Sequence, residues 1–146
     1  TEIYTLSLHD ALPILPYSYC YGASNACYDY GCSEIQVSNG GTDVLVLIKT
    51  GSNRVIRHAY IQAKNRFTFH LPNGTYNVFF YSGVGWNPNK IMSSGDCTIK
   101  GGFVGSETTG KDSDVRVYNQ ILQYTLQQVV NGNFSMESSS KSEVFN

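Results

Sequence analysis

A short stretch in the middle of the chain restricts the possible folds most strongly, because its side chains alternate and its turn is tight. Residues 66–71, RFTFHL, place two phenylalanines and a leucine on one face of a strand and polar side chains on the other. The turn residues 72–74, PNG, allow a sharp reversal, and residues 75–82, TYNVFFYS, read as the returning strand. This pattern predicts a β-hairpin with one face in an apolar core.

Several other segments also have the composition of strands. We predict a short strand over 35–37 and a central strand over 43–49, where DVLVLIK is a nearly continuous apolar run. The turn 50–53, TGSN, connects this run to a predicted strand over 54–62. Successive hairpins of this kind predict a β-meander or β-sandwich.

The second half of the chain has weaker signals. Its glycine-rich and polar composition predicts loops over 83–90, 93–96 and 100–114. Residues 117–130 fit either one face of a helix or an alternating strand, and we favour the strand because the rest of the chain is β-rich. The polar tail allows one helical turn before Phe145.

Residues 1–14, TEIYTLSLHDALPI, do not have the basic start and long apolar core of a secretory signal, since they contain no lysine or arginine and include Glu2 and Asp10. They resemble the translation of a common Illumina sequencing adapter, and all fourteen codons of the adapter agree with these residues. This resemblance implies a metagenomic or draft-genome reading frame from which the natural start, with any signal peptide, is missing. We therefore expect residues 1–14 to be an artefact and assign His9 no role.

The remaining residues, 15–146, are enough for one domain with its own core. Without residues 1–14 there are ten basic and nine acidic side chains, which indicates neither a nucleic-acid-binding surface nor an acidic tail. No apolar run reaches the roughly 18 residues of a transmembrane helix. Only 14% of residues are charged, and eleven tyrosines and fourteen glycines fit a β-rich exported protein.

Residues 15–34 are rich in tyrosine and cysteine and are called here the N-terminal strap. The chain has four cysteines, Cys20, Cys27, Cys32 and Cys97. Their even number favours two disulfides in an oxidising compartment, and three pairings are possible. Free thiols are one alternative. A zinc-stabilised cytoplasmic module is another, although the C-x6-C part of the C-x6-C-x4-C spacing is wider than the cysteine pairs typical of structural zinc sites.

One enzymatic alternative can be formulated from the sequence, a small thiol-dependent hydrolase that uses Cys97 with His58 or His70. The surrounding sequence GDCTIKGG contains no nucleophile signature, and a hydrogen-bonded position within a strand is the expected role of each histidine. The glycine-rich segments also lack the complete dinucleotide-binding and P-loop patterns. We therefore expect no catalytic residue, no cofactor and no metal.

The most prominent candidate for binding is the segment 81–88, YSGVGWNP, which contains the only tryptophan. Trp86 stands between a glycine and an Asn-Pro turn, and an aromatic side chain on a loop suits contact with a sugar ring or with an apolar anchor of a partner. The candidate binding residues are Trp86, Tyr81 and Asn87. The alternative is that Trp86 folds back and caps the end of a sandwich.

Two resemblances follow from these motifs. The stretch 67–84, FTFHLPNGTYNVFFYSGV, is similar to a strand–turn–strand pattern of transthyretin-like and carboxypeptidase-regulatory-like β-sandwiches. More widely, residues 16–146, with CYG, YGCSEI, RHAYI, IKGGF and NGNFS, resemble an uncharacterised all-β domain family of anaerobic gut bacteria. The second resemblance implies a genuine bacterial domain and carries over no catalytic residue.

Together these observations predict an all-β protein, a single antiparallel β-sandwich of transthyretin or immunoglobulin type. The expected organisation is an artefact over 1–14, a Cys/Tyr-rich strap over 15–34, and a sandwich over 35–146 that ends in a short polar tail. The expected function is a non-catalytic binding or structural module with an unknown protein or glycan partner. We expect it in the periplasm, on the cell surface or secreted.

Overall fold

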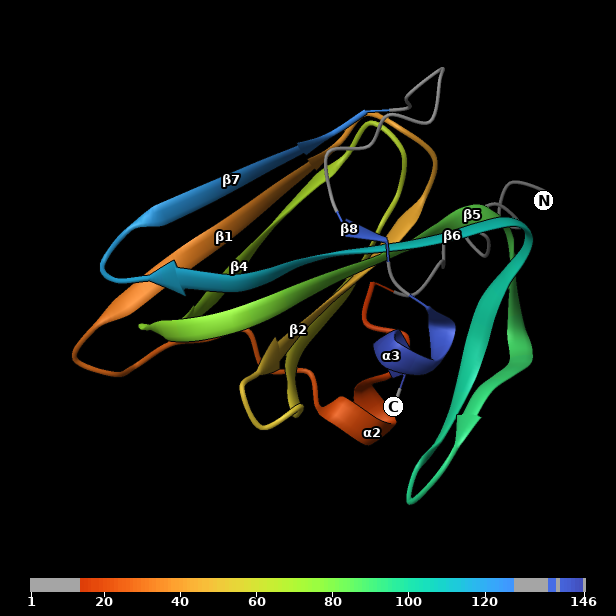
Figure 1. Cartoon of the computed structure of the whole chain (residues 1–146), viewed down its shortest axis with the longest axis horizontal. Helices are drawn as coiled ribbons and strands as arrows, with labels where there is room; N and C mark the ends of the chain where they lie inside the picture. Colours follow the sequence, from red (N-terminus) through yellow and green to blue (C-terminus); the bar gives the residue numbers. More distant parts are fainter. Residues whose placement is uncertain (1–13, 128–136, 139, 146) are drawn as a thin grey trace, which may run out of the picture.

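The structure is a computed structural model that describes residues 14–127, 137–138 and 140–145. Its elements are α2 (Ser18–Tyr21), β1 (Cys32–Asn39), β2 (Val44–Thr50), β3 (Val55–Ile61), β4 (Arg66–Pro72), β5 (Gly74–Ser94), β6 (Thr98–Val117), β7 (Ile121–Leu126), β8 (Glu137–Ser138) and α3 (Lys141–Phe145). The two helices are short, so the described chain is essentially all-β, as predicted (Figure 1). Within the described part, no helix has the length and apolar character needed to cross a membrane.

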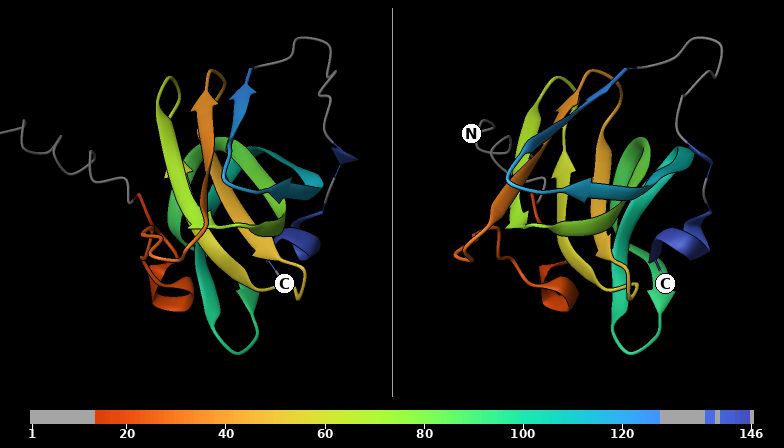
Figure 2. Two further views of the ribbon diagram at one scale, coloured as in Figure 1. Left: turned by 90° about the vertical axis from the view of Figure 1, so that its left-hand side faces the viewer. Right: turned by 60° about the vertical axis from the view of Figure 1, so that its left-hand side comes forward.

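The strands form two sheets that pack face to face, which confirms the predicted β-sandwich (Figure 2). One sheet has three strands in the order β4-β1-β7, and the other has five in the order β3-β2-β5-β6-β8. All neighbouring strands run antiparallel except β1 and β7, which are parallel. The strand favoured for 117–130 is therefore present as β7, and its partner is the distant β1 rather than the preceding β6.

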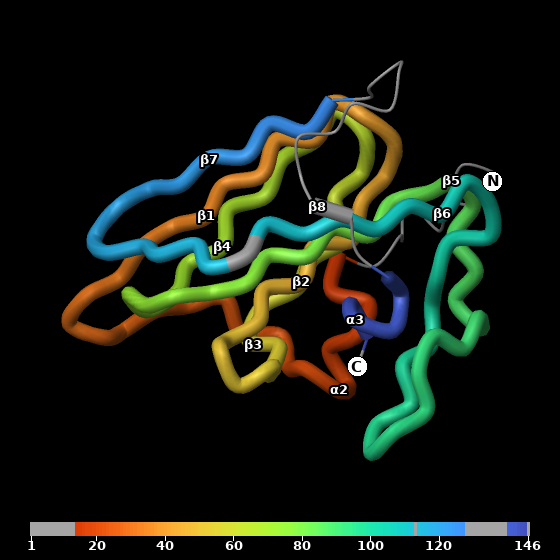
Figure 3. The backbone as a smooth tube through the Cα atoms, in the orientation of Figure 1, coloured from red at the N-terminus to blue at the C-terminus, as the bar shows by residue number. Residues whose placement is uncertain are grey.

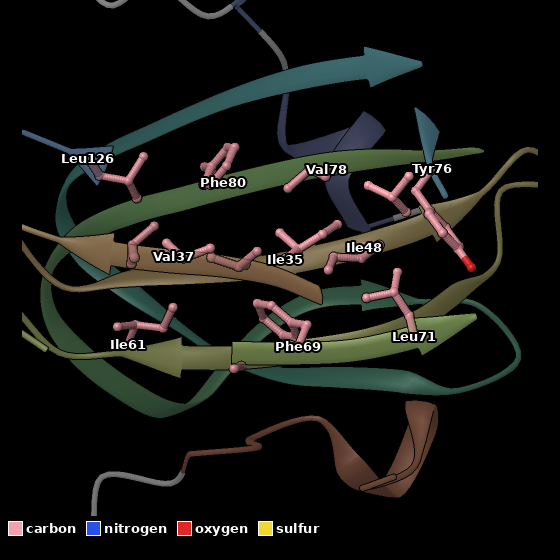
Figure 4. Close-up of a cluster of buried hydrophobic side chains, with 14 residues drawn as sticks. Ile35, Val37, Ile48, Ile61, Phe69, Leu71, Tyr76, Val78, Phe80 and Leu126 are labelled. Carbon is pink, nitrogen blue, oxygen red and sulfur yellow. The ribbon is translucent and has the colours of Figure 1, made fainter. Parts of the chain in front are cut away.

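The space between the two sheets holds the inner core (Figure 4). Because side chains alternate along a strand, each sheet contributes every second residue to this layer. The three-stranded sheet supplies Ile35, Val37, Phe69, Leu71 and Leu126, all buried. Strand β2 is buried on both faces, as the continuous apolar run predicted, because a second apolar layer lies on the other side of the five-stranded sheet.

This second layer, called here the outer core, covers the face of the five-stranded sheet that points away from the sandwich. Leu45 and Leu47 of β2 form its floor. Tyr17 of the strap and Phe145 of α3 close over them, and both are buried. The helical turn expected before Phe145 is thus present, and it fixes the end of the chain to the sheet.

The predicted loops over 83–90 and 100–114 are wrong, because both segments belong to the long strands β5 and β6. The two strands form one hairpin whose outer part bends sharply away from the sandwich (Figure 3). This outer part, residues 83–105, is called here the arm. Its pairing shifts register at several points, and the Asn-Pro sequence falls in one of them, between Asn87 and Ile91. Such irregularities are where a strand accommodates proline and glycine.

The N-terminal strap differs from its predicted extent, since Cys32 already begins β1. Before that point the strap contains one helical turn, α2, and then runs beside the edge strand β4. Just before the strap, the carbonyl of Ile14 accepts a 2.7 Å hydrogen bond from the backbone N–H of Tyr60 in β3. Within the strap, the backbone N–H of Tyr17 donates a 2.9 Å hydrogen bond to Nε2 of His58, also in β3. The strap therefore contacts both sheets of the sandwich.

Candidate functional site

The four cysteines form two disulfides of different kinds. Cys20 of α2 is joined to Cys97 at the tip of the arm, and their Cα atoms are 5.9 Å apart. Cys27 is joined to Cys32, with a Cα–Cα distance of 6.1 Å, and closes a small ring. The expectation of disulfides agrees with this arrangement. No cysteine is left as a free thiol.

This pairing removes the groups that the enzymatic and zinc alternatives need. The sulfur of Cys97 is bonded to Cys20, so it is not available as a thiolate nucleophile. His58 lies in β3 of the five-stranded sheet, whereas His70 lies in β4 of the three-stranded sheet. Among the described residues, no group of histidine, cysteine and carboxylate side chains is arranged to hold a metal ion.

His58 is the hydrogen-bonded strand histidine that the sequence predicted. It is buried against the strap, where its ring stacks on Tyr17 with a centroid distance of 5.6 Å. The backbone N–H of Tyr17 donates a 2.9 Å hydrogen bond to Nε2 of His58. Burial lowers the pKa of His58 to about 4, although a hydrogen bond with the Leu15 backbone acts in the opposite direction. His58 is therefore neutral at physiological pH and joins the strap to the sheet.

Trp86 is part of an aromatic cluster and is only partly accessible. Its ring is 5.0 Å from Tyr60 and 5.2 Å from Phe103, measured between centroids. It also lies against Gly101, where a Cβ atom would come within 2.6 Å of the indole ring. Trp86 therefore covers one side of the outer core from a strand of the arm. This arrangement is similar to the alternative expected from the sequence, in which Trp86 folds back and caps the end of a sandwich.

The two residues grouped with Trp86 differ from each other in exposure and in their contacts. Tyr81 is completely buried, and its hydroxyl donates to Glu107 at 2.5 Å and accepts from the N–H of Phe103 at 2.8 Å. Its role is to hold the base of the arm. Asn87 is exposed, and its side-chain oxygen accepts a 2.9 Å hydrogen bond from the N–H of Asn89. Asn87 thus shapes the irregular part of β5.

A different part of the molecule presents aromatic side chains to solvent. The disulfide ring over 27–32, CYDYGC, carries Tyr28 and Tyr30, which are 93% and 111% exposed. We call this ring with its two side chains the tyrosine tip. Tyrosine is enriched at recognition surfaces, because its ring combines a large apolar area with a polar hydroxyl. Tyr118, 63% exposed, follows β6 at the same end of the sandwich.

Side chains hold the segment before the tyrosine tip against the edge of β4, where they make hydrogen bonds that an additional strand would otherwise make. The amide of Asn25 donates to the carbonyl of Thr68 and accepts from the N–H of His70, both at 2.9 Å, so it satisfies the free edge of β4. Arg57 donates to the carbonyls of His70 and Ala26, at 2.8 and 2.9 Å. These contacts fix the backbone that leads into the ring.

On its other side the ring contacts two turns of the sandwich. The carbonyl of Gly31 accepts a 3.1 Å hydrogen bond from the N–H of Asn73. Asn73 in turn exchanges two hydrogen bonds with Asn119, at 2.8 and 2.7 Å. A Cβ atom at position 31 would collide with the Asn73 side chain, so glycine is required for this close approach. The ring is therefore preorganised.

The outward face of the three-stranded sheet continues from the tyrosine tip, because Cys32 is both a ring residue and the first residue of β1. We call this face the sheet platform. Its side chains are Glu34, Gln36 and Ser38 of β1, Arg66, Thr68 and His70 of β4, and Ile121, Gln123 and Thr125 of β7. Nearly all of them are polar, and only one is a carboxylate.

Comparison with protein-family models, with curated proteins and with solved structures gives no match to this chain. Its assignment to a bacterial family and the adapter origin of residues 1–14 therefore stay predictions.

Sequence reasoning placed the binding site at Trp86 and did not select the tyrosine tip. The available signal was the short spacing of Cys27 and Cys32 around two tyrosines. A disulfide between these two residues leaves too few residues in the ring for their side chains to fold back into a core. Because three pairings were open, this reading could not be separated from the others.

Proposed function

We propose that this chain is a non-catalytic binding module that works outside the cytoplasm and contacts a glycan or protein partner through the tyrosine tip. One observation carries the proposal: two nearly fully exposed tyrosines stand on a disulfide ring whose Gly31 carbonyl is hydrogen-bonded to the turn at Asn73, and Asn25, just before the ring, is hydrogen-bonded to the edge of β4. Aromatic side chains on a rigid scaffold lose little conformational entropy when they bind.

The extracytoplasmic location is supported by the two disulfides, which persist in oxidising compartments and are rare in the cytosol. The non-catalytic character is supported by the bonding of the residues that the sequence offered as catalytic candidates. The thiol of Cys97 is bonded, and the hydrogen bonds of His58 lie within the strap and sheet.

The test is binding to an array that carries neutral glycans, anionic glycans and extracellular proteins. The wild-type chain is compared with the double variant Tyr28→Ser/Tyr30→Ser. The expected result is a set of wild-type signals that fall about tenfold or more in the double variant, which corresponds to the loss of roughly 1.4 kcal/mol of binding free energy.

Two further variants make this result specific. Tyr19→Ser removes an exposed tyrosine from α2, away from the tip, and should leave the signals unchanged. Tyr28→Phe/Tyr30→Phe keeps both rings and should retain most of the binding. Equal signals for the wild type and the serine double variant, or no signal on any spot, would show that the tyrosine tip is not a binding site.

A further inference from the structure

We infer that the partner is a neutral polysaccharide that lies along the sheet platform and stacks on the tyrosine tip at one end. This inference rests on the proposed function and extends it, since it names the partner class and adds the sheet platform to the site. The two surfaces are continuous because β1 leads directly out of the disulfide ring. The platform side chains of β1 therefore form a row that begins at the ring.

The hydrogen-bonding groups of the platform are arranged before any ligand binds. Nε2 of Gln123 donates to Oε1 of Gln36 at 3.0 Å, and Nε2 of Gln36 donates to Oε1 of Glu34 at 3.1 Å. Nδ1 of His70 lies 3.6 Å from the other Glu34 oxygen. This chain of contacts crosses all three strands. Glutamine side chains that are already held by one another lose less rotamer entropy on binding than free ones.

The charge of the platform favours an uncharged partner. Its one carboxylate, Glu34, and its one guanidinium, Arg66, occupy separate positions along the sheet, and the groups between them are amides and hydroxyls. An anionic polymer would need a cluster of basic side chains, as would a nucleic acid. Amides and hydroxyls both donate and accept hydrogen bonds, which suits a polyhydroxyl ligand.

The shape and composition also distinguish a polysaccharide from a protein partner. A protein interface normally has an apolar centre that becomes fully buried, and the centre of this platform is Gln36 with its neighbours Thr68 and Gln123. The apolar groups lie at one end, on the tyrosine tip and Ile121. From Cys32 to Ser38 the row extends about 20 Å, the length of a short oligosaccharide.

The test uses native gel electrophoresis through soluble polysaccharides: mixed-linkage β-glucan, xyloglucan, galactomannan and dextran, with polygalacturonate as the anionic comparison. We expect at least one neutral polysaccharide to retard the wild-type chain and polygalacturonate to have no effect. Gln36→Ala/Gln123→Ala and Tyr28→Ser/Tyr30→Ser should each weaken that retardation about tenfold or more. The matched control Gln62→Ala changes a glutamine outside the platform, and thermal unfolding reports whether each variant is folded.

The outcomes separate this inference from the proposed function. If no neutral polysaccharide retards the wild type, or if polygalacturonate alone does, the polysaccharide inference is wrong, while tip-dependent signals on array proteins would leave the binding module standing. If the tyrosine variant loses retardation and the glutamine variant keeps it, the platform is not part of the site. If the glutamine variant loses it and the tyrosine variant keeps it, the proposed role of the tyrosine tip fails.

Discussion

The backbone N–H of Tyr17 donates a 2.9 Å hydrogen bond to Nε2 of His58, and this contact joins the N-terminal strap to the outer core. It requires the neutral imidazole, because a protonated ring has no acceptor at Nε2. The rings of Tyr17 and Tyr21 both pack against His58, at centroid distances of 5.6 Å. Neither ring carries a carboxylate that would stabilise a positive charge on the imidazole. The attachment of the strap is therefore sensitive to acid.

The first prediction concerns the pH dependence of stability. Burial lowers the pKa of His58 from 6.5 to about 4, so between these values the unfolded chain binds a proton that the folded chain does not. The free energy of unfolding should accordingly fall as the pH drops through this window, by up to about 3 kcal/mol. Urea unfolding of the wild type and His58→Gln at pH values from about 7.5 to about 4 measures it. Equal slopes for the two proteins in this window would contradict the assignment.

The second prediction separates the two disulfides by their effect on stability. Cys20–Cys97 spans 77 residues and Cys27–Cys32 spans 5. Loop-closure entropy gives a stabilisation of about 4 kcal/mol for the long loop and about 2 kcal/mol for the short one. Urea unfolding of Cys20→Ser/Cys97→Ser and Cys27→Ser/Cys32→Ser compares them directly. A larger loss in the short-loop variant would show that the ring, rather than the arm, is the main covalent support of the fold.

The third prediction concerns the accessibility of the tyrosines. Limited nitration with tetranitromethane should modify Tyr28 and Tyr30 first, because their rings stand in solvent, and should spare the buried Tyr17 and Tyr81. Peptide mass spectrometry after proteolysis measures the modification at each position. Protection of Tyr28 and Tyr30 in the folded monomer would mean that the tyrosine tip is covered, and the proposed site would then be lost.

The fourth prediction tests the packing of Trp86 on the arm. Gly101 has a φ of 117°, and a Cβ atom there would lie 2.6 Å from the indole ring. Gly101→Ala should therefore displace the ring, lower the free energy of unfolding by roughly 1–3 kcal/mol, and shift tryptophan emission toward the red. Gly95→Ala is the control, because no atom lies within 4 Å of the added group. Unchanged emission in Gly101→Ala would contradict this packing.

The strands of the sandwich were predictable because each obeys a local rule. Alternation identified the two strands on either side of the turn 72–74, and the unbroken apolar run identified the central strand β2. The predicted hairpin is wrong, because β4 and β5 belong to different sheets and do not pair with each other. The parallel pairing of β1 with β7 was not predictable, since it joins residues about 90 positions apart and no local pattern encodes such a partner. The final helical turn could be anticipated, but its place over the outer core depends on tertiary packing.

The glycines of the arm predict turns, whereas the structure places them within the strands β5 and β6. In the structure several of them provide room for aromatic side chains: a Cβ atom on Gly83 would lie 2.6 Å from Phe103, and one on Gly101 would meet Trp86. A sequence does not distinguish a glycine that turns the chain from one that permits close packing. The same limit explains why the sequence favoured Trp86 and Tyr81 as candidate binding residues and not the tyrosine tip. The burial of Tyr81 and the exposure of Tyr28 both depend on how the arm and strap fold over the sheet.

We propose that the Cys27–Cys32 ring holds Tyr28 and Tyr30 in the geometry needed for binding. A variant in which the ring is open but both tyrosines remain provides the test. Binding of Cys27→Ser/Cys32→Ser to the glycan and protein array should fall about tenfold or more on the spots that recognise the wild type, while the variant stays folded at the assay temperature. Binding equal to that of the wild type would contradict the claim, because the tyrosines would then work without the ring.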